Sequence, residues 1–149
     1  MNKKTEILNN LRSAKSAHMK WKAHALALVQ GLPLHESQVP IIHTDCAFGK
    51  WYYGAGLKLS TLDAYTALDK PHEQLHEVYS RIFKLLFGEE DRSLFSKLFG
   101  SKAKVLKHKT EAESLMKMLT NISSDVVGLM NRLEMEISAM SDEDVEALI

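Results

Sequence analysis

Three long segments of this sequence place apolar residues every three or four positions, which is the spacing of one face of an α-helix. The first runs from Ile7 to Leu28, the second from Tyr65 to Leu86, and the third from Val105 to Leu133. The sequence has no run in which apolar and polar residues alternate, as they do in a half-buried β-strand. We therefore expect an all-α protein whose helices pack their apolar faces together.

Glycine and proline residues set the expected limits of these helices. Gly31 and Pro33 end the first helix, and Gly88 ends the second. Pro71 interrupts the second pattern, because a proline inside a helix removes a backbone hydrogen bond. We expect Asp69 to cap a new helix that has Pro71 in its first turn.

Two shorter elements complete the expected fold. Residues 45–53 predict a short helix, capped by Thr44 or Asp45. The composition of residues 88–103 indicates a connector with one short apolar helical turn. The fold prediction is thus a four-helix-bundle-like domain with an additional short connector helix.

The third segment is long for a domain of this size. A helix of thirty-odd residues spans about 45–50 Å at roughly 1.5 Å per residue, so its far end should protrude or pack against a second chain. It can extend to residue 140. We expect residues 1–140 to form the helical domain and the acidic residues 141–149 to form a frayed tail.

Charge and hydropathy restrict the class of partner. Nineteen basic and nineteen acidic residues give a net charge of zero, whereas nucleic-acid binding usually requires a basic excess. No apolar run approaches the roughly 20 residues that span a bilayer, and the first residues lack the apolar core of a secretory signal. The single cysteine forms no intrachain disulfide. These features predict a cytoplasmic protein that binds neither nucleic acid nor membrane.

Four side chains have the donor atoms of a zinc site. His18 and His72 stand in apolar stripes, and a buried imidazole needs partners for its ring nitrogens. His76 follows His72 by about one helical turn, so both rings can chelate one ion. Cys46 opens the short helix, whose N-terminal dipole favours a thiolate. One thiolate and three imidazoles suit a tetrahedral Zn²⁺, one per chain.

The donor atoms alone leave other interpretations open. His18 alone is better explained as an ordinary buried histidine, and the spacing of His72 and His76 fits chance as well as it fits metal binding. The same residues match the H-E-x-x-H motif of zinc metallopeptidases, in which Glu73 would be the general base. Cys46 would then close the coordination position that a catalytic zinc keeps open, which disfavours a peptidase.

Three motifs occur in a fixed order: AHMKW at 17–21, DCAFGKWYYGAG at 45–56 and KPHEQLH at 70–76. They resemble the bacterial chemoreceptor zinc-binding domain, whose pattern is a His three residues before a Trp, then C-x-F-G-x-W, then H-x-x-x-H. The resemblance implies a helical bundle, often dimeric, found in cytoplasmic chemoreceptors or in front of diguanylate cyclases. It implies the zinc ligands His18, Cys46, His72 and His76, with Trp21 and Trp51 packed beside the site.

The resemblance also implies a sensory function without catalysis. We expect a homodimer that senses zinc or oxidants such as hypochlorous acid through Cys46 and acts on a chemotaxis or diguanylate cyclase partner. The alternatives are the metallopeptidase and a purely structural zinc domain. His43 has a usable metal spacing from Cys46 but no role in the family pattern, so we interpret it as a loop residue. Asp45, Glu73 and Glu77 are expected to offset the charge of the site or to orient a histidine.

Overall fold

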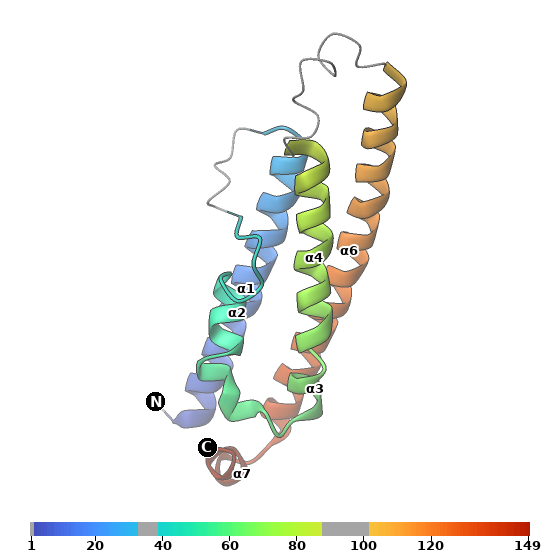
Figure 1. Cartoon of the computed structure of the whole chain (residues 1–149). Coiled ribbons are helices and arrows are strands. Elements are labelled where there is room, and N and C mark those ends of the chain that lie inside the picture. The colour runs from blue at the N-terminus through green and yellow to red at the C-terminus, as the bar shows by residue number, and fades with distance from the viewer. Residues whose placement is uncertain (1, 33–38, 88–101) are drawn as a thin grey trace.

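Three long helices form the body of the protein in a computed structural model that describes residues 2–32, 39–87 and 102–149. They are α1 (Lys3–Val29), α4 (Asp69–Phe87) and α6 (Lys102–Ala139), and they lie side by side, with α6 antiparallel to the other two (Figure 1). The short elements are α2 (Ala47–Tyr52), the 3-10 helix η2 (Ala55–Leu59), α3 (Asp63–Thr66) and α7 (Asp142–Ala147). The described residues contain no strand, so the all-α prediction is confirmed.

Apolar periodicity places the core where the sequence predicts it. The buried face of α1 repeats every three or four residues, and α6 packs against both α1 and α4 through a face with the same repeat. The N-terminal turns of α6 extend past the ends of α1 and α4, as expected from its length (Figure 1). The buried residues of α1 are Leu11, Ala14, His18, Trp21, Ala25 and Leu28.

The helix that contains Pro71 begins at Asp69 itself, so the proline lies in its first turn as predicted. Asp69 is the first helical residue rather than the residue before the helix. Its carboxylate accepts a hydrogen bond from the hydroxyl of Tyr53, which connects the start of α4 to the end of α2.

The short helix α2 is held by side-chain contacts at both ends. At its C-terminal end, the rings of Tyr52 and Tyr65 stack with their centres 4.3 Å apart, and each hydroxyl donates a hydrogen bond to the other residue's carbonyl. Before its N-terminus, the carbonyl of Pro40 accepts a hydrogen bond from the indole of Trp21 on α1 at 3.0 Å. These contacts hold the segment against α1 and α3.

Two predictions about helix ends are corrected. The side chain of Cys46, not Thr44 or Asp45, caps α2, because its sulfur accepts a hydrogen bond from the backbone of Gly49 at 3.2 Å. The acidic tail forms α7 instead of fraying, because Ser141 caps it and Val145 is fully buried. The connector helix predicted within 88–103 lies almost entirely outside the described residues.

Within the described parts of the chain, no helix combines the length and the apolar character needed to cross a bilayer.

Candidate metal centre

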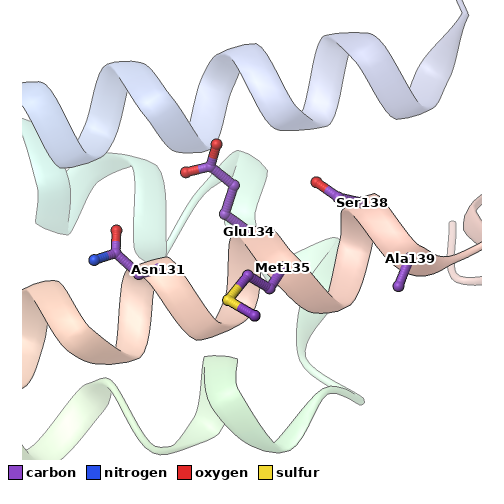
Figure 2. Close-up of a pocket in the computed structure, with 5 residues that line it drawn as sticks. All are labelled: Asn131, Glu134, Met135, Ser138 and Ala139. Atoms are coloured by element: carbon purple, nitrogen blue, oxygen red, sulfur yellow. The ribbon is translucent and has the colours of Figure 1, made fainter.

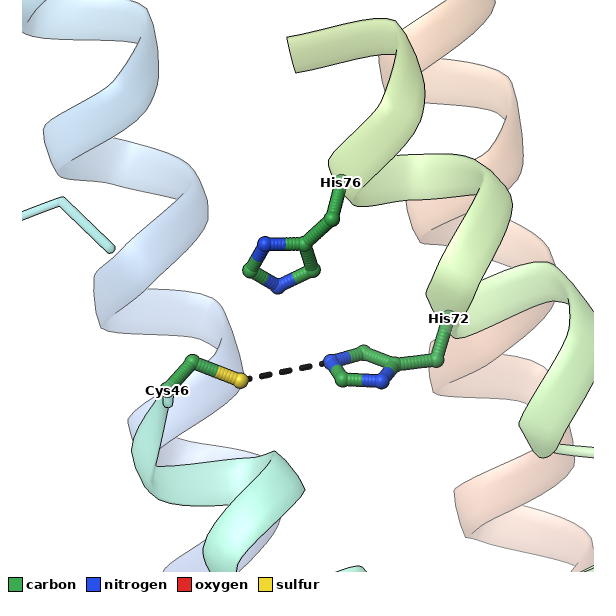
Figure 3. A group of neighbouring side chains, drawn as sticks. All are labelled: Cys46, His72 and His76. Carbon is green, nitrogen blue, oxygen red and sulfur yellow. Dashed lines mark hydrogen bonds between the residues drawn. The ribbon is translucent and has the colours of Figure 1, made fainter. Parts of the chain in front are cut away.

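Three of the four predicted ligands meet inside the bundle. One donor atom from each of Cys46, His72 and His76 lies within 4.8 Å of the other two, and all three side chains are buried. Figure 3 shows the sulfur at the start of α2 facing the two imidazoles on successive turns of α4. The sulfur lies 3.3 Å from Nε2 of His72, close to the roughly 3.5 Å that separates sulfur and nitrogen ligands of one tetrahedral zinc.

Two imidazole nitrogens in this cluster have no hydrogen-bond partner although they are buried. They are Nδ1 of His72 and Nε2 of His76. Nδ1 of His76 lies 2.8 Å from the carbonyl of Ile41, and since a carbonyl only accepts, Nδ1 carries the proton. Nε2 of His76 therefore presents a lone pair toward Cys46 and His72 (Figure 3). A buried lone pair without a donor is costly, and a metal ion would satisfy it.

His18 lies beside this group but outside it. Its side chain on α1 is 2% exposed, and its ring centre is 6.5 Å from that of His72. Its Nε2 is 3.1 Å from the hydroxyl of Ser123, the fully buried serine of α6. The structure thus brings three predicted ligands together and places His18 next to them with a different partner.

Burial keeps all three histidines neutral. Desolvation lowers the pKa of His18 to about 4, with smaller contributions from His76 and Lys22. The pKa of His72 falls to about 2, mainly by desolvation and then by His76, and that of His76 falls to about 4 by desolvation. Neutral imidazoles are the form that binds a metal ion, so no proton must leave these rings first.

The thiol of Cys46 behaves differently from the sequence prediction. Burial raises its pKa, and this effect exceeds the opposite effect of the hydrogen bond from the Gly49 amide. The start of α2 therefore does favour the thiolate, as predicted, but not enough to outweigh desolvation. A cation at the site would supply the missing stabilisation of the negative sulfur.

Aromatic side chains separate the cluster from water. The ring of Trp21 is centred 4.4 Å from that of His76, and the ring of Phe48 is centred 4.5 Å from that of His72. The prediction that Trp21 packs beside the site is confirmed. Trp51 lies one layer further out, against Phe48. Such walls lower the local dielectric constant and strengthen any bond between a metal ion and its ligands.

The predicted carboxylate partners do not belong to the site. Asp45, Glu73 and Glu77 are all exposed. Glu73 and Glu77 each follow a ligand histidine by one residue, which turns them about 100° away on the helix and toward solvent. The carbonyl of Ile41 orients His76 instead, so the prediction of carboxylate orientation is wrong.

Sequence reasoning set aside one residue that the structure places at the site. The ring of His43 is centred 6.0 Å from that of His72 and 6.4 Å from that of His76, and its carbonyl accepts a hydrogen bond from the sulfur of Cys46 at 3.4 Å. Gly49 makes this approach possible, because a Cβ there would lie 1.9 Å from the same carbonyl. The H-x-x-C spacing between His43 and Cys46 was the sequence feature that could have indicated His43 as a site residue.

A separate groove on α6 lacks the chemistry of a metal site. Figure 2 shows its five lining residues, which include a single carboxylate, Glu134. That carboxylate already forms ion pairs with Arg12 at 2.7 Å and Lys15 at 2.9 Å. The donor atoms suited to a soft or borderline metal gather at the buried cluster.

Part of the chain matches a known family of protein domains. Residues 18–83 match the sequence model of the chemoreceptor zinc-binding domain, a stretch that begins at His18 and includes all four predicted ligands. The resemblance noted in the sequence is confirmed for this stretch, which covers less than half of the chain. Neither the curated proteins nor the solved structures yield a match.

Proposed function

We propose that this chain is a zinc-binding sensory domain that holds one zinc through His18, Cys46, His72 and His76. The observation that supports this function most strongly is the buried, unsatisfied Nε2 of His76, which faces a sulfur that lies 3.3 Å from Nε2 of His72 (Figure 3). In this role zinc would act as a Lewis acid that stabilises the thiolate and joins three segments of the chain.

His18 is the proposed ligand that lies outside the group formed by the other three. Its ring already lies within 6.5 Å of the ring of His72, and burial keeps it neutral. The hydroxyl of Ser123 holds one of its nitrogens. The Ser123 hydroxyl can act as the partner that orients a ligand histidine, a role that carboxylates, backbone carbonyls and water fill at other metal sites.

We propose that the signal acts on Cys46. This residue caps α2, a helix of six residues, so a change at its sulfur alters both a ligand and a helix cap. With hypochlorous acid, oxygen would pass to the thiolate and chloride would leave, giving a sulfenic acid that is a poorer ligand. Loss of zinc itself would release the same segment. Both inputs converge on the packing of α2.

The output is proposed to pass through α6 to a chemotaxis or diguanylate cyclase partner. The hydrogen bond between His18 and Ser123 joins the site to this helix. On the outer surface of α6, Met135 is 72% exposed and Gly128 has open space around it, which leaves a face for a second copy of the chain. The proposed dimer would be detected by sedimentation equilibrium.

A zinc hydrolase is the alternative from another class. It needs Glu73 beside the metal as a general base, whereas Glu73 is exposed on α4. Glu73→Ala would abolish activity in a hydrolase and leave metal content unchanged in a sensor.

Elemental analysis of the purified protein tests the proposed site. Wild type should contain about one zinc per chain, and Cys46→Ala and His72→Ala should contain less. His24→Ala is the control, because this partly buried histidine on α1 belongs to no donor group in the described chain. Wild type without zinc, or zinc content unaffected by Cys46→Ala, would contradict the assignment.

A further inference from the structure

The cluster contains more donor side chains than a tetrahedral zinc ion uses. Four are the proposed ligands, and His43 is the fifth. Its ring centre lies 6.0 Å from that of His72 and 6.4 Å from that of His76, compared with 6.5 Å between His18 and His72. By ring position, His43 is as close to the α4 histidines as a proposed ligand is.

Simple geometry indicates how far the ring of His43 would have to move. Two imidazoles bound to one tetrahedral zinc at the usual bond length have ring centres about 5 Å apart. His72 and His76 already meet this condition, with centres 4.9 Å apart. His43 is about 1 Å too far from each, a distance that a rotation about its side-chain bonds can cover.

The backbone of His43 is held by its contacts, whereas its ring is only half-buried and packs edge-on against Tyr53. The carbonyl of His43 rests against Gly49, with no room for a Cβ between them, and accepts a hydrogen bond from Cys46. His18, in contrast, is 2% exposed, and its ring is hydrogen-bonded to Ser123. His43 therefore approaches the cluster from the solvent side, next to the sulfur.

We propose that His43 is a reserve ligand that takes the coordination position of Cys46 when the sulfur no longer binds zinc. The neutral imidazole would replace the thiolate, so the charge of the site would rise from +1 to +2 and the affinity would fall without being lost. Zinc would stay on the chain while α2 loses its tie to α4. The switch would then reset when Cys46 is reduced, without a new zinc ion. This inference rests on the proposed zinc site.

A double-mutant cycle with zinc tests the reserve ligand. Zinc affinity is measured by competition with a chromophoric chelator for wild type, His43→Ala, Cys46→Ala and the double variant, with circular dichroism as the check on folding. His43→Ala should weaken zinc binding by Cys46→Ala at least tenfold and should weaken zinc binding by wild type several times less than that. Cys46→Ala/His24→Ala, the control, should match Cys46→Ala.

Equal effects of His43→Ala in both backgrounds, or no effect in either, would overturn the proposal. So would a folded Cys46→Ala variant that binds no zinc. These results differ from a failure of the proposed zinc site itself, in which wild type would bind no zinc or Cys46→Ala would bind as tightly as wild type. Cobalt(II) provides a second readout, since the spectrum of the Cys46→Ala complex should change on adding His43→Ala.

Discussion

The two sides of the metal centre are built very differently. His72 and His76 project from α4, a helix of 19 residues that packs along α6. Cys46 precedes a helix of six residues that depends on a cap, two stacked tyrosines and one close glycine contact. A short helix is barely stable without such contacts. A metal ion at this site would therefore join a rigid scaffold, α4 and α6, to the weakly held segment around α2. Loss of the metal ion would mainly destabilise that segment.

The largest effect is expected from the scaffold. Leu133→Ala removes a fully buried side chain of α6 and should lower the free energy of unfolding by roughly 2–5 kcal/mol. Zinc affinity of the folded protein should stay within twofold, because residue 133 is about 15 Å along the helix from Ser123. Urea denaturation and chelator competition measure the two quantities. Glu113→Ala, at an exposed position of α6, is the control and should change stability little. A large loss of zinc affinity in Leu133→Ala would contradict the view that the stability of the scaffold and the affinity of the site are separate.

A matched pair of glycine substitutions tests the weakly held side. Gly49→Ala places a Cβ against the carbonyl of His43 and should cost roughly 1–3 kcal/mol, together with a loss of zinc affinity. Gly128→Ala, with open space around it in α6, should stabilise the protein by up to about 1 kcal/mol. Thermal denaturation and zinc titration measure both. Zinc binding by Gly49→Ala that equals wild type would show that the contact between Gly49 and the His43 carbonyl does not constrain the site.

Ser123→Ala tests the connection between the site and α6. The substitution removes the hydroxyl partner of His18 and leaves a buried nitrogen unsatisfied, at a cost of roughly 1–2 kcal/mol. If the serine orients a zinc ligand, zinc affinity should also fall about tenfold. Chelator competition separates the two effects, since a purely structural serine would change stability alone.

The smallest effect is expected at the ion pairs between α1 and α6. Arg12 and Lys15 lower the pKa of Glu134 through hydrogen bonds. The lowered pKa stabilises the fold at pH values above the ordinary pKa of a glutamate. This contribution is lost as the pH falls through the lowered pKa of Glu134. Glu134→Gln should therefore cost only a few tenths of a kcal/mol at pH 7, because the pair is near the surface. Urea denaturation at pH 7 and pH 3 measures this, and a larger cost at pH 3 would contradict it.

Much of the fold could be predicted from the sequence because its helices are long and regular. The stripe from Ile7 to Leu28 corresponds to the buried face of α1, with only Ile7 partly exposed. Pro71 correctly predicted where the first turn of α4 lies. The helix α7 could not be predicted, because its six residues are too few to show a helical period and the burial of Val145 depends on packing against α1. Helical periodicity carries no information about such isolated contacts.

The sequence was enough to predict which side chains could donate to a metal ion. It was not enough to predict how the structure arranges all of them. The motifs pointed to Cys46, His72 and His76, which the structure brings together. The bond between His18 and Ser123 joins residues 105 positions apart, so no local pattern could indicate it. The place of His43 depends on a carbonyl that fits only because residue 49 has no side chain. Both facts require the tertiary structure.

Hydrogen–deuterium exchange of the protein with and without zinc tests the central claim most directly. At free zinc 1,000 times the Kd, binding stabilises the bound form by on the order of 4 kcal/mol. Removal of zinc by a chelator should speed exchange at least tenfold in residues 39–59. The exchange rates in the buried part of α6, residues 112–137, should stay nearly unchanged. Uniform acceleration along the chain, or none in residues 39–59, would contradict the view that zinc joins a weakly held segment to a rigid scaffold.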